Sequence, residues 1–251
     1  MSLARAGVLV TLAALLAGCG GGGRAATSHA ITSKAVTEPT PKAHVSRVEI
    51  PLGSGNLAAM AGPRGLLLRD RPHGRVIAHL RPQTAYGSPT VVWAAARRGD
   101  WLGVVAARVP NNHLGWLNVQ HDRPQMWRSP YGLFAHLAQR TLIVERRGHV
   151  LRTIPVTVGA PGTPSPLGRF EVTDKLLLSR ESGYGCCILA LSGHQPFLRP
   201  GWAGSDRIAI HGSPAQLVGT AASAGCLRAR DADLRYLMKR IPLGTPVYIK
   251  A

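Results

Sequence analysis

Short apolar runs separated by turn residues fill the middle of this 251-residue chain. The runs are rich in Val, Ile and Leu, and the whole sequence holds 29 Gly and 19 Pro, many of them between the runs. This pattern predicts β-strands joined by turns rather than helices. We expect strands at 66–69, 76–80, 90–95, 99–105 and 114–119, and this spacing predicts a small barrel.

The C-terminal half shows the same alternation of apolar runs and turns. We expect strands at 141–145, 150–158, 169–172, 207–211 and 246–250. Pro155 cannot donate a ladder hydrogen bond, so it predicts a free edge or a bulge in its strand. Roughly thirty residues separate the strands at 169–172 and 207–211, and a segment this long beside a site is typical of a lid or substrate-binding flap.

One helix is predicted near the C-terminus. Its apolar residues recur at i, i+3, i+4 and i+7 and define one buried face: Leu234, Leu237, Met238 and Ile241. Asp231 is expected to cap the N-terminus of this helix, and Pro242 with Gly244 is expected to end it.

The first residues have the pattern of an export signal. Arg5 provides a positive charge, and residues 6–16 form an apolar run too short to span a bilayer. The run ends in Leu-Ala-Gly-Cys19, which resembles the bacterial lipoprotein signal, in which the cysteine carries the lipid. The alternative is an ordinary secretory signal with a coincidental cysteine. We expect an exported lipoprotein, anchored to the membrane through Cys19 and facing the periplasm or cell-wall zone.

Residues 20–46 consist mainly of Gly, Ala, Ser, Thr, Pro and Lys without periodicity, which is typical of a flexible linker. Its mean span would be about 30 Å, so an anchored domain could work above the membrane. The formal net charge of +18 suggests nucleic acid, but the basic residues are scattered and form no nucleic-acid motif. Anionic lipid headgroups and acidic wall polymers are the expected partners, and nucleic acid is not.

Two of the four cysteines are adjacent, Cys186 and Cys187. Neighbours on a strand point to opposite faces, so we expect two buried thiols rather than an ordinary disulfide. A zinc site made of this pair with His194 and Cys226 lacks the paired spacing of zinc ligands. We therefore expect no metal and no other cofactor.

Candidate chemistry lies between residues 207 and 228. An alternating strand ends in His211, and a turn rich in small residues presents Cys226 15 positions later. An imidazole that removes the proton of a thiol creates the nucleophile for acyl transfer. We interpret Cys226 as the nucleophile and His211 as the proton donor and acceptor.

Residues 47–122 resemble the bacterial SH3-like domain. The match rests on the Gly-Asp-Trp101-Leu-Gly-Val-Val strand and on Gly115-Trp116. The resemblance implies a module that binds the cell wall or positions the catalytic domain beside it. A purely structural barrel with tryptophans in its core is the alternative.

Four ordered motifs resemble the L,D-transpeptidase catalytic domain. They are Thr163-Pro164 with residues 166–170, Ile210-His211-Gly212, Ser223-Ala-Gly-Cys226-Leu-Arg228, and Gly-Thr-Pro-Val at 244–247. The resemblance assigns residues 128–251 to this domain. It implies a mainly β protein: a small SH3-like barrel followed by a β-sandwich catalytic domain with one or two short helices.

The same resemblance implies a cysteine enzyme that acts on peptidoglycan stem peptides. Its product would be a cross-link between the third residues of two stems, formed through a thioester, and carbapenem-type inhibitors would acylate it. Many members have histidine where this chain has Ala224, which leaves His211 as the one candidate base in the motifs.

Four further residues are assigned supporting roles. The N–H groups of Gly225 and Cys226 are hypothetical oxyanion donors, since glycine lets the backbone approach a substrate closely. Ser213 could orient the imidazole or be a turn residue. Arg228 could pair with a stem carboxylate or form a structural salt bridge. Ser223 matches the family motif.

Several alternatives remain open from the sequence. The same site with water as acceptor would be an L,D-carboxypeptidase, and with a protein as acceptor it would be a transferase that anchors proteins to the wall. An inactive wall-binding lipoprotein is the non-enzyme alternative. A papain-like protease is disfavoured because the catalytic histidine of that family follows the cysteine in the sequence, whereas here His211 precedes Cys226.

Overall fold

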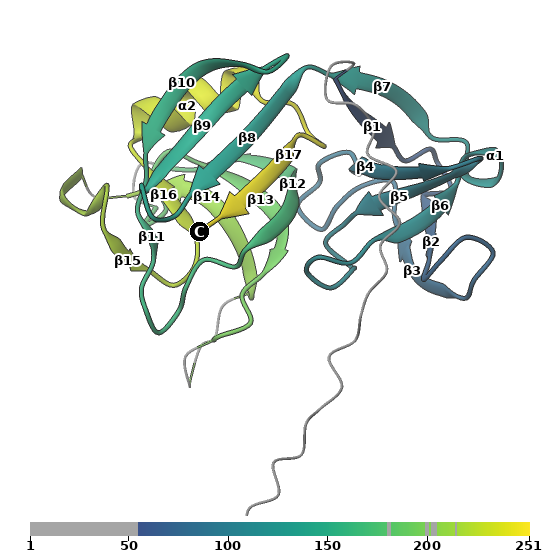
Figure 1. Cartoon of the computed structure of the whole chain (residues 1–251), viewed down its shortest axis with the longest axis horizontal. Coiled ribbons are helices and arrows are strands. Elements are labelled where there is room, and N and C mark those ends of the chain that lie inside the picture. Colours follow the sequence, from purple (N-terminus) through teal and green to yellow (C-terminus); the bar gives the residue numbers. More distant parts are fainter. Residues whose placement is uncertain (1–54, 180–181, 199–200, 202–204, 214) are drawn as a thin grey trace, which may run out of the picture. The chain divides into compact units, whose positions relative to one another are not determined.

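The computed structural model describes residues 55–179, 182–198, 201, 205–213 and 215–251. The export signal, Cys19 and the linker at 20–46 lie outside the described residues. Residues 45–251 form one compact unit, and its described part is mainly β (Figure 1), as predicted. No helix among the described residues has the length and apolar character needed to cross a membrane.

The first sheet is antiparallel, with the strand order β3-β2-β6-β5-β4-β1-β7. Its strands are β1 (Asn56–Met60), β2 (Leu66–Arg69), β3 (Val76–Leu80), β4 (Val91–Arg98), β5 (Trp101–Val105), β6 (Gly115–Asn118) and β7 (Gln125–Ser129). The sheet surrounds its own apolar core, in which Leu66, Leu68, Leu102, Val104 and Leu117 are fully buried.

All five strands expected in this region are present, and β1 and β7 add two more. Residue 119 was expected at the end of a strand, but it begins the short helix α1 (Val119–Asp122). The reason is local, because the Asn118 side chain accepts hydrogen bonds from the N–H groups of Gln120 and His121 and caps the turn. The SH3-like assignment stays a prediction.

The second sheet has eight strands in the order β10-β9-β8-β17-β12-β13-β14-β16. They are β8 (Tyr131–His136), β9 (Thr141–Arg146), β10 (His149–Pro155), β12 (Gly168–Leu177), β13 (Cys187–His194), β14 (Arg207–Gly212), β16 (Leu227–Ala229) and β17 (Pro246–Lys250). A separate parallel pair joins β11 (Val158–Gly159) to β15 (Ala221–Ser223), and a 3-10 turn, η2 (Ala215–Leu217), precedes β15.

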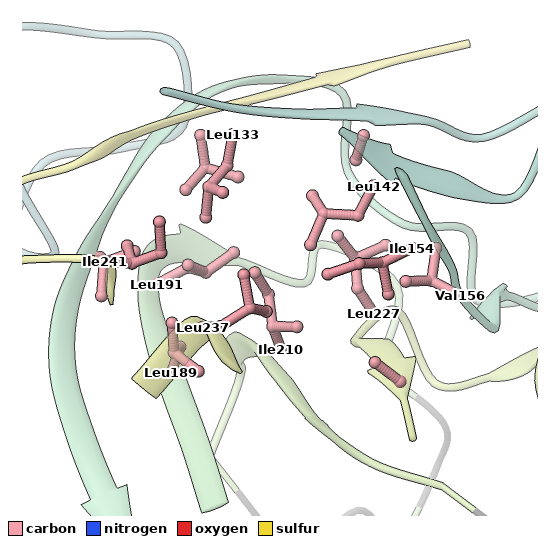
Figure 2. Packing of buried hydrophobic residues seen from close by; sticks show 14 of the residues in the cluster. Leu133, Leu142, Ile154, Val156, Leu189, Leu191, Ile210, Leu227, Leu237 and Ile241 are labelled. Atoms are coloured by element: carbon pink, nitrogen blue, oxygen red, sulfur yellow. The ribbon is translucent and has the colours of Figure 1, made fainter. Parts of the chain in front are cut away.

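Strand β12 connects the two halves of this sheet. Residues 168–171 pair with β17, whereas residues 172–177 pair with β13, and the register shifts between Val172 and Asp174. A strand that changes partner at a bulge turns the sheet, so its halves face each other as a β-sandwich. Leucines, isoleucines and valines from both halves fill the space between them (Figure 2).

Two further predictions for this half concern strand β10 and the segment between residues 172 and 207. β10 is an edge strand and carries a bulge between Val150 and Arg152, which confirms the prediction from Pro155. Part of the segment expected as a lid or flap belongs to the sheet, because it contains the end of β12 and all of β13, and a lid or flap role for the rest stays a prediction.

The predicted helix is α2 (Asp231–Arg240), and Leu234, Leu237 and Ile241 are fully buried beneath it. The expected cap was wrong. Arg230 occupies the N-cap position without a side-chain hydrogen bond, and Asp231 Oδ1 instead accepts from the Cys186 N–H at 3.2 Å. The carboxylate therefore joins the helix start to the segment before β13.

Candidate active site

Neighbouring strands β14 and β16 bring His211 and Cys226 together. The two strands are parallel, with Ile210 opposite Leu227 and His211 opposite Arg228. Cys226 directly precedes β16, so continued extension sets it across from Ala209 with its side chain on the face that carries His211. A strand spacing of about 4.8 Å and a rise of about 3.3 Å per residue put the two Cα atoms about 8 Å apart, within reach of their side chains.

His211 is buried and has a defined orientation. Its Nδ1 lies 2.8 Å from the carbonyl oxygen of Gly212, so Nδ1–H donates and Nε2 is left as the nitrogen that can accept a proton. Burial, followed by the nearby Arg228 cation, lowers the pKa of His211 to about 4. The imidazole is therefore neutral at physiological pH and ready to act as a base.

Cys226 is a free, partly exposed cysteine. Burial of the thiol raises its pKa, while a backbone hydrogen bond with Ala209 and the Arg228 cation lower it to a smaller extent. Thiol and imidazole are consequently both neutral at rest, and the thiolate can form only when His211 takes the proton.

Ser223 and Gly225 shape the turn that presents the thiol. Ser223 Oγ donates to the Cys226 carbonyl at 2.6 Å and accepts from the Gly225 N–H at 3.1 Å. Gly225 has φ +113°, a region that side chains rarely adopt. Since its N–H is already bonded, the hypothesis that Gly225 donates to an oxyanion requires this bond to break first.

Sequence reasoning missed Gln195, which anchors the same turn. This buried side chain donates from Nε2 to Ala224 O at 2.9 Å and to Pro164 O at 3.0 Å, and its Oε1 accepts from the Phe197 N–H at 3.1 Å. It directly follows β13, in the segment interpreted as a flap. No local pattern marks a glutamine as an anchor when its partners are 29 and 31 residues away.

Tyr184 and Gly185 pack against His211 and Gly212. The Tyr184 ring lies edge-on to the His211 imidazole, with the ring centroids 4.9 Å apart. The Tyr184 backbone carbonyl accepts a hydrogen bond from the Gly212 N–H at 2.6 Å. A Cβ on Gly185 would lie 2.6 Å from the Gly212 Cα, so only glycine permits this approach. These contacts exclude water from one side of the imidazole.

The expectation of two separate thiols at Cys186 and Cys187 was wrong. The two residues form a disulfide between sequence neighbours. The argument from opposite strand faces failed because Cys186 lies before β13, in the turn, and only Cys187 belongs to the strand. His194, considered with them for zinc, instead places its two ring nitrogens against Asp206 and the Ala107 carbonyl. Among the described residues, no cluster of three or more His, Cys, Asp or Glu could hold a metal.

Arg228 and Ser213 lie beside His211. Arg228 is opposite His211 in the β14–β16 pair, and its buried Nε has no hydrogen-bond partner among the described residues. A buried unpaired N–H costs free energy, so it favours an oxygen ligand at this position. The carbonyl that orients the imidazole is that of Gly212, and Ser213 follows one residue later.

Comparison with known proteins shows what the segment that holds this site is similar to. Residues 130–249 match the family model described as the L,D-transpeptidase catalytic domain. All the residues of the site described above fall within this segment.

Individual proteins show the same similarity. The chain is 29% identical over 130 residues to YkuD of Bacillus subtilis (strain 168), a match that covers 50% of this chain and 70% of that protein. It is 25% identical over 130 residues to L,D-transpeptidase 1 of Mycobacterium tuberculosis (strain ATCC 25618 / H37Rv), covering 46% of this chain and 48% of that protein. The match therefore spans about half the length of the mycobacterial relative.

A solved structure, LD transpeptidase LdtMt1 in complex with imipenem, aligns with 78% of this chain and 99% of its own, at 15% identity and a TM-score of 0.41.

Proposed function

We propose that this protein is a peptidoglycan L,D-transpeptidase that works through a thioester on Cys226. One observation carries the proposal: a free thiol and a neutral imidazole share one face of adjacent strands, inside the segment that matches the L,D-transpeptidase catalytic domain. The motif resemblance and the geometry support the same two residues.

The first half of the reaction forms the acyl-enzyme. Cys226 Sγ attacks the carbonyl between the third residue of a tetrapeptide stem and its terminal D-alanine while His211 Nε2 takes the thiol proton. His211 then returns this proton to the departing amine, so the amide bond breaks and D-alanine leaves.

The second half transfers the acyl group. The side-chain amine of another stem's third residue attacks the thioester, His211 accepts its proton, and the thiol is restored. The product joins the third residues of two stems. If water replaces the amine, the same site acts as a carboxypeptidase.

The pKa values decide when the proton moves. Burial raises the pKa of the Cys226 thiol and lowers that of His211 to about 4, so moving the proton before the attack costs free energy. Attraction between the resulting thiolate and imidazolium offsets part of this cost. The remaining cost favours attack and proton transfer in one step rather than a stored thiolate.

The N-terminal part of the proposal concerns location. An exported lipoprotein anchored through Cys19, with a linker and an SH3-like module, would place the catalytic site at the cell wall. The resemblances at 16–19 and 101–116 support this part of the proposal.

Acylation of Cys226 tests the function. We expect intact-mass spectrometry to show one carbapenem adduct on the wild type and none on Cys226→Ala, with Gln120→Ala, an exposed glutamine on α1, as the unaffected control. Chromatography of tetrapeptide-rich muropeptides should then show D-alanine release and cross-linked dimers. The same mass increase for wild type and Cys226→Ala, or no increase for either, would end the enzyme proposal.

A further inference from the structure

A cavity of about 820 Å³ lies apart from the thiol and the imidazole. Connections of the first sheet, at residues 79–86 and 106–108, line one side, and Glu171, Asp174 and Arg207 of the second sheet line the other. Cys226, His211 and Gln195 are not among its lining residues. Arg207 and His211 are the first and fifth residues of β14, which separates them by about 13 Å along the strand.

Three ionisable side chains form the wall on the second sheet. Glu171 and Asp174 are each only 1% exposed, and Arg207 is half-buried. The Trp93 N–H donates to Glu171, the Thr84 hydroxyl donates to Asp174, and Arg207 donates to Thr173 Oγ1 at 3.0 Å.

The bonds to Glu171 and Asp174 connect the first sheet and its loops to the second sheet, but this connection alone does not explain the charges. Replacing buried ionic groups by well-packed apolar residues of similar size is often neutral or stabilising. A ligand that needs these groups explains why they line an open cavity.

The other lining residues determine which parts of the cavity are apolar and which are charged. Leu80, Val91, Val92 and Ala106 form an apolar floor, and the exposed side chains of Arg81, Arg108 and Tyr86 form the rim. Burial raises the pKa of Glu171 well above its usual value, which favours the neutral form of this carboxyl. The three guanidinium groups of Arg81, Arg108 and Arg207 outnumber the two acidic side chains, so the cavity is net positive.

We propose that this cavity binds a short anionic peptide with a free amine, of the kind found in peptidoglycan stems, as a second site beside the catalytic one. Ligand carboxylates would meet the arginines, the ammonium group would meet Asp174, and alanine methyl groups would lie on the apolar floor. The volume falls in the range of sites for molecules of several hundred daltons, which suits a tetrapeptide better than a single amino acid. The identity of the peptide rests on the proposed function, whereas the cavity and its charges do not.

The test separates the two sites by blocking the first one. The wild-type protein is acylated at Cys226 with a carbapenem, and calorimetry then measures binding of a soluble stem tetrapeptide and, in a parallel titration, of free D-alanine. We expect the tetrapeptide to bind the acylated protein at one site and D-alanine to bind at least tenfold more weakly.

Variants then locate the binding. Arg81→Glu with Arg108→Glu should weaken tetrapeptide binding at least tenfold, because both side chains are at the rim. The matched pair Arg64→Glu with Arg146→Glu makes the same charge change at exposed positions outside the cavity and should leave binding within twofold of wild type. Asp174→Asn keeps an acceptor for the Thr84 hydroxyl but loses the charge, and it should weaken binding of the amine-bearing peptide by a similar factor.

Each outcome supports or overturns the proposal. Absence of binding to the acylated protein, equal binding by the rim variant and the control, or tighter binding of D-alanine than of the tetrapeptide would overturn it. If the carbapenem does not acylate Cys226, the proposed function fails separately. The titrations are then repeated on Cys226→Ala, where the rim variant and its control decide the cavity proposal.

Discussion

Gln195 offers the sharpest test of how the structure positions the thiol. Its side chain makes hydrogen bonds of 2.9, 3.0 and 3.1 Å to Ala224 O, Pro164 O and the Phe197 N–H. Gln195→Ala removes these three bonds and a longer one of 3.4 Å to Thr163 O, and it leaves three carbonyls and one N–H without this partner. At about 1 kcal/mol net for each bond, we expect the free energy of unfolding to fall by about 2–4 kcal/mol.

The effect on chemistry follows from the bond to Ala224 O. Ala224 is two residues before Cys226, so loss of this anchor frees the turn that aims the sulfur at His211. A displacement of about 1 Å can cost about 100-fold in rate. We expect carbapenem acylation of Gln195→Ala to be slower by about 10- to 100-fold.

The assay combines three measurements on Gln195→Ala and on Gln120→Ala as the matched control. Thermal unfolding reports the stability, stopped-flow absorbance reports the acylation rate, and alkylation by iodoacetamide reports the reactivity of the thiol alone. A displaced but accessible sulfur should lose acylation and keep alkylation. Acylation within twofold of wild type, in a variant that is destabilised as expected, would refute the positioning argument.

Three further predictions concern the same site. Gly225→Ala should reduce the acylation rate more than 100-fold and destabilise the protein by roughly 1–3 kcal/mol, because φ is +113° and the new Cβ would lie 2.1 Å from Gln195 Nε2. The control is Gly162→Ala, whose Cβ would meet nothing within 4 Å. An acylation rate for Gly225→Ala equal to that of the wild type would contradict the described geometry of the turn. The acylation rate should stay level as pH falls to about 5 and decline about tenfold per pH unit below about 4, because protonated His211 cannot accept the thiol proton. Circular dichroism at each pH checks that the protein remains folded. A midpoint of the rate profile near pH 6.5 would show that burial does not lower the pKa of His211. The double variant Cys186→Ala with Cys187→Ala should change the melting temperature by only a few degrees, since a disulfide between sequence neighbours closes the shortest possible loop. It should slow acylation several-fold, because the Tyr184 segment that packs on His211 would be held less firmly. An unchanged acylation rate would show that the disulfide does not support the active site.

Much of this protein is determined locally and can be predicted from the sequence. Apolar runs between turn residues predict the strands, because the side-chain period of two and the turn chemistry act over a few residues. Spacing alone predicts that Leu234, Leu237 and Ile241 are buried, and Pro155 predicts a free edge or a bulge in its strand. His211 and Cys226 stand out because a recurring motif holds both the residues and their order.

Other features exist only because distant segments meet in the folded chain. Gln195 anchors the Cys226 turn through carbonyls on two other segments, and Asp231 binds a backbone N–H 45 residues away instead of capping its helix. The disulfide depends on where β13 begins, a boundary that pattern reading does not locate to one residue. The cavity at Glu171 and Arg207 depends on packing between two sheets. Hydrogen bonding and burial across such distances are properties of the tertiary structure, whereas the local sequence determines the strands, the turns and the helix face.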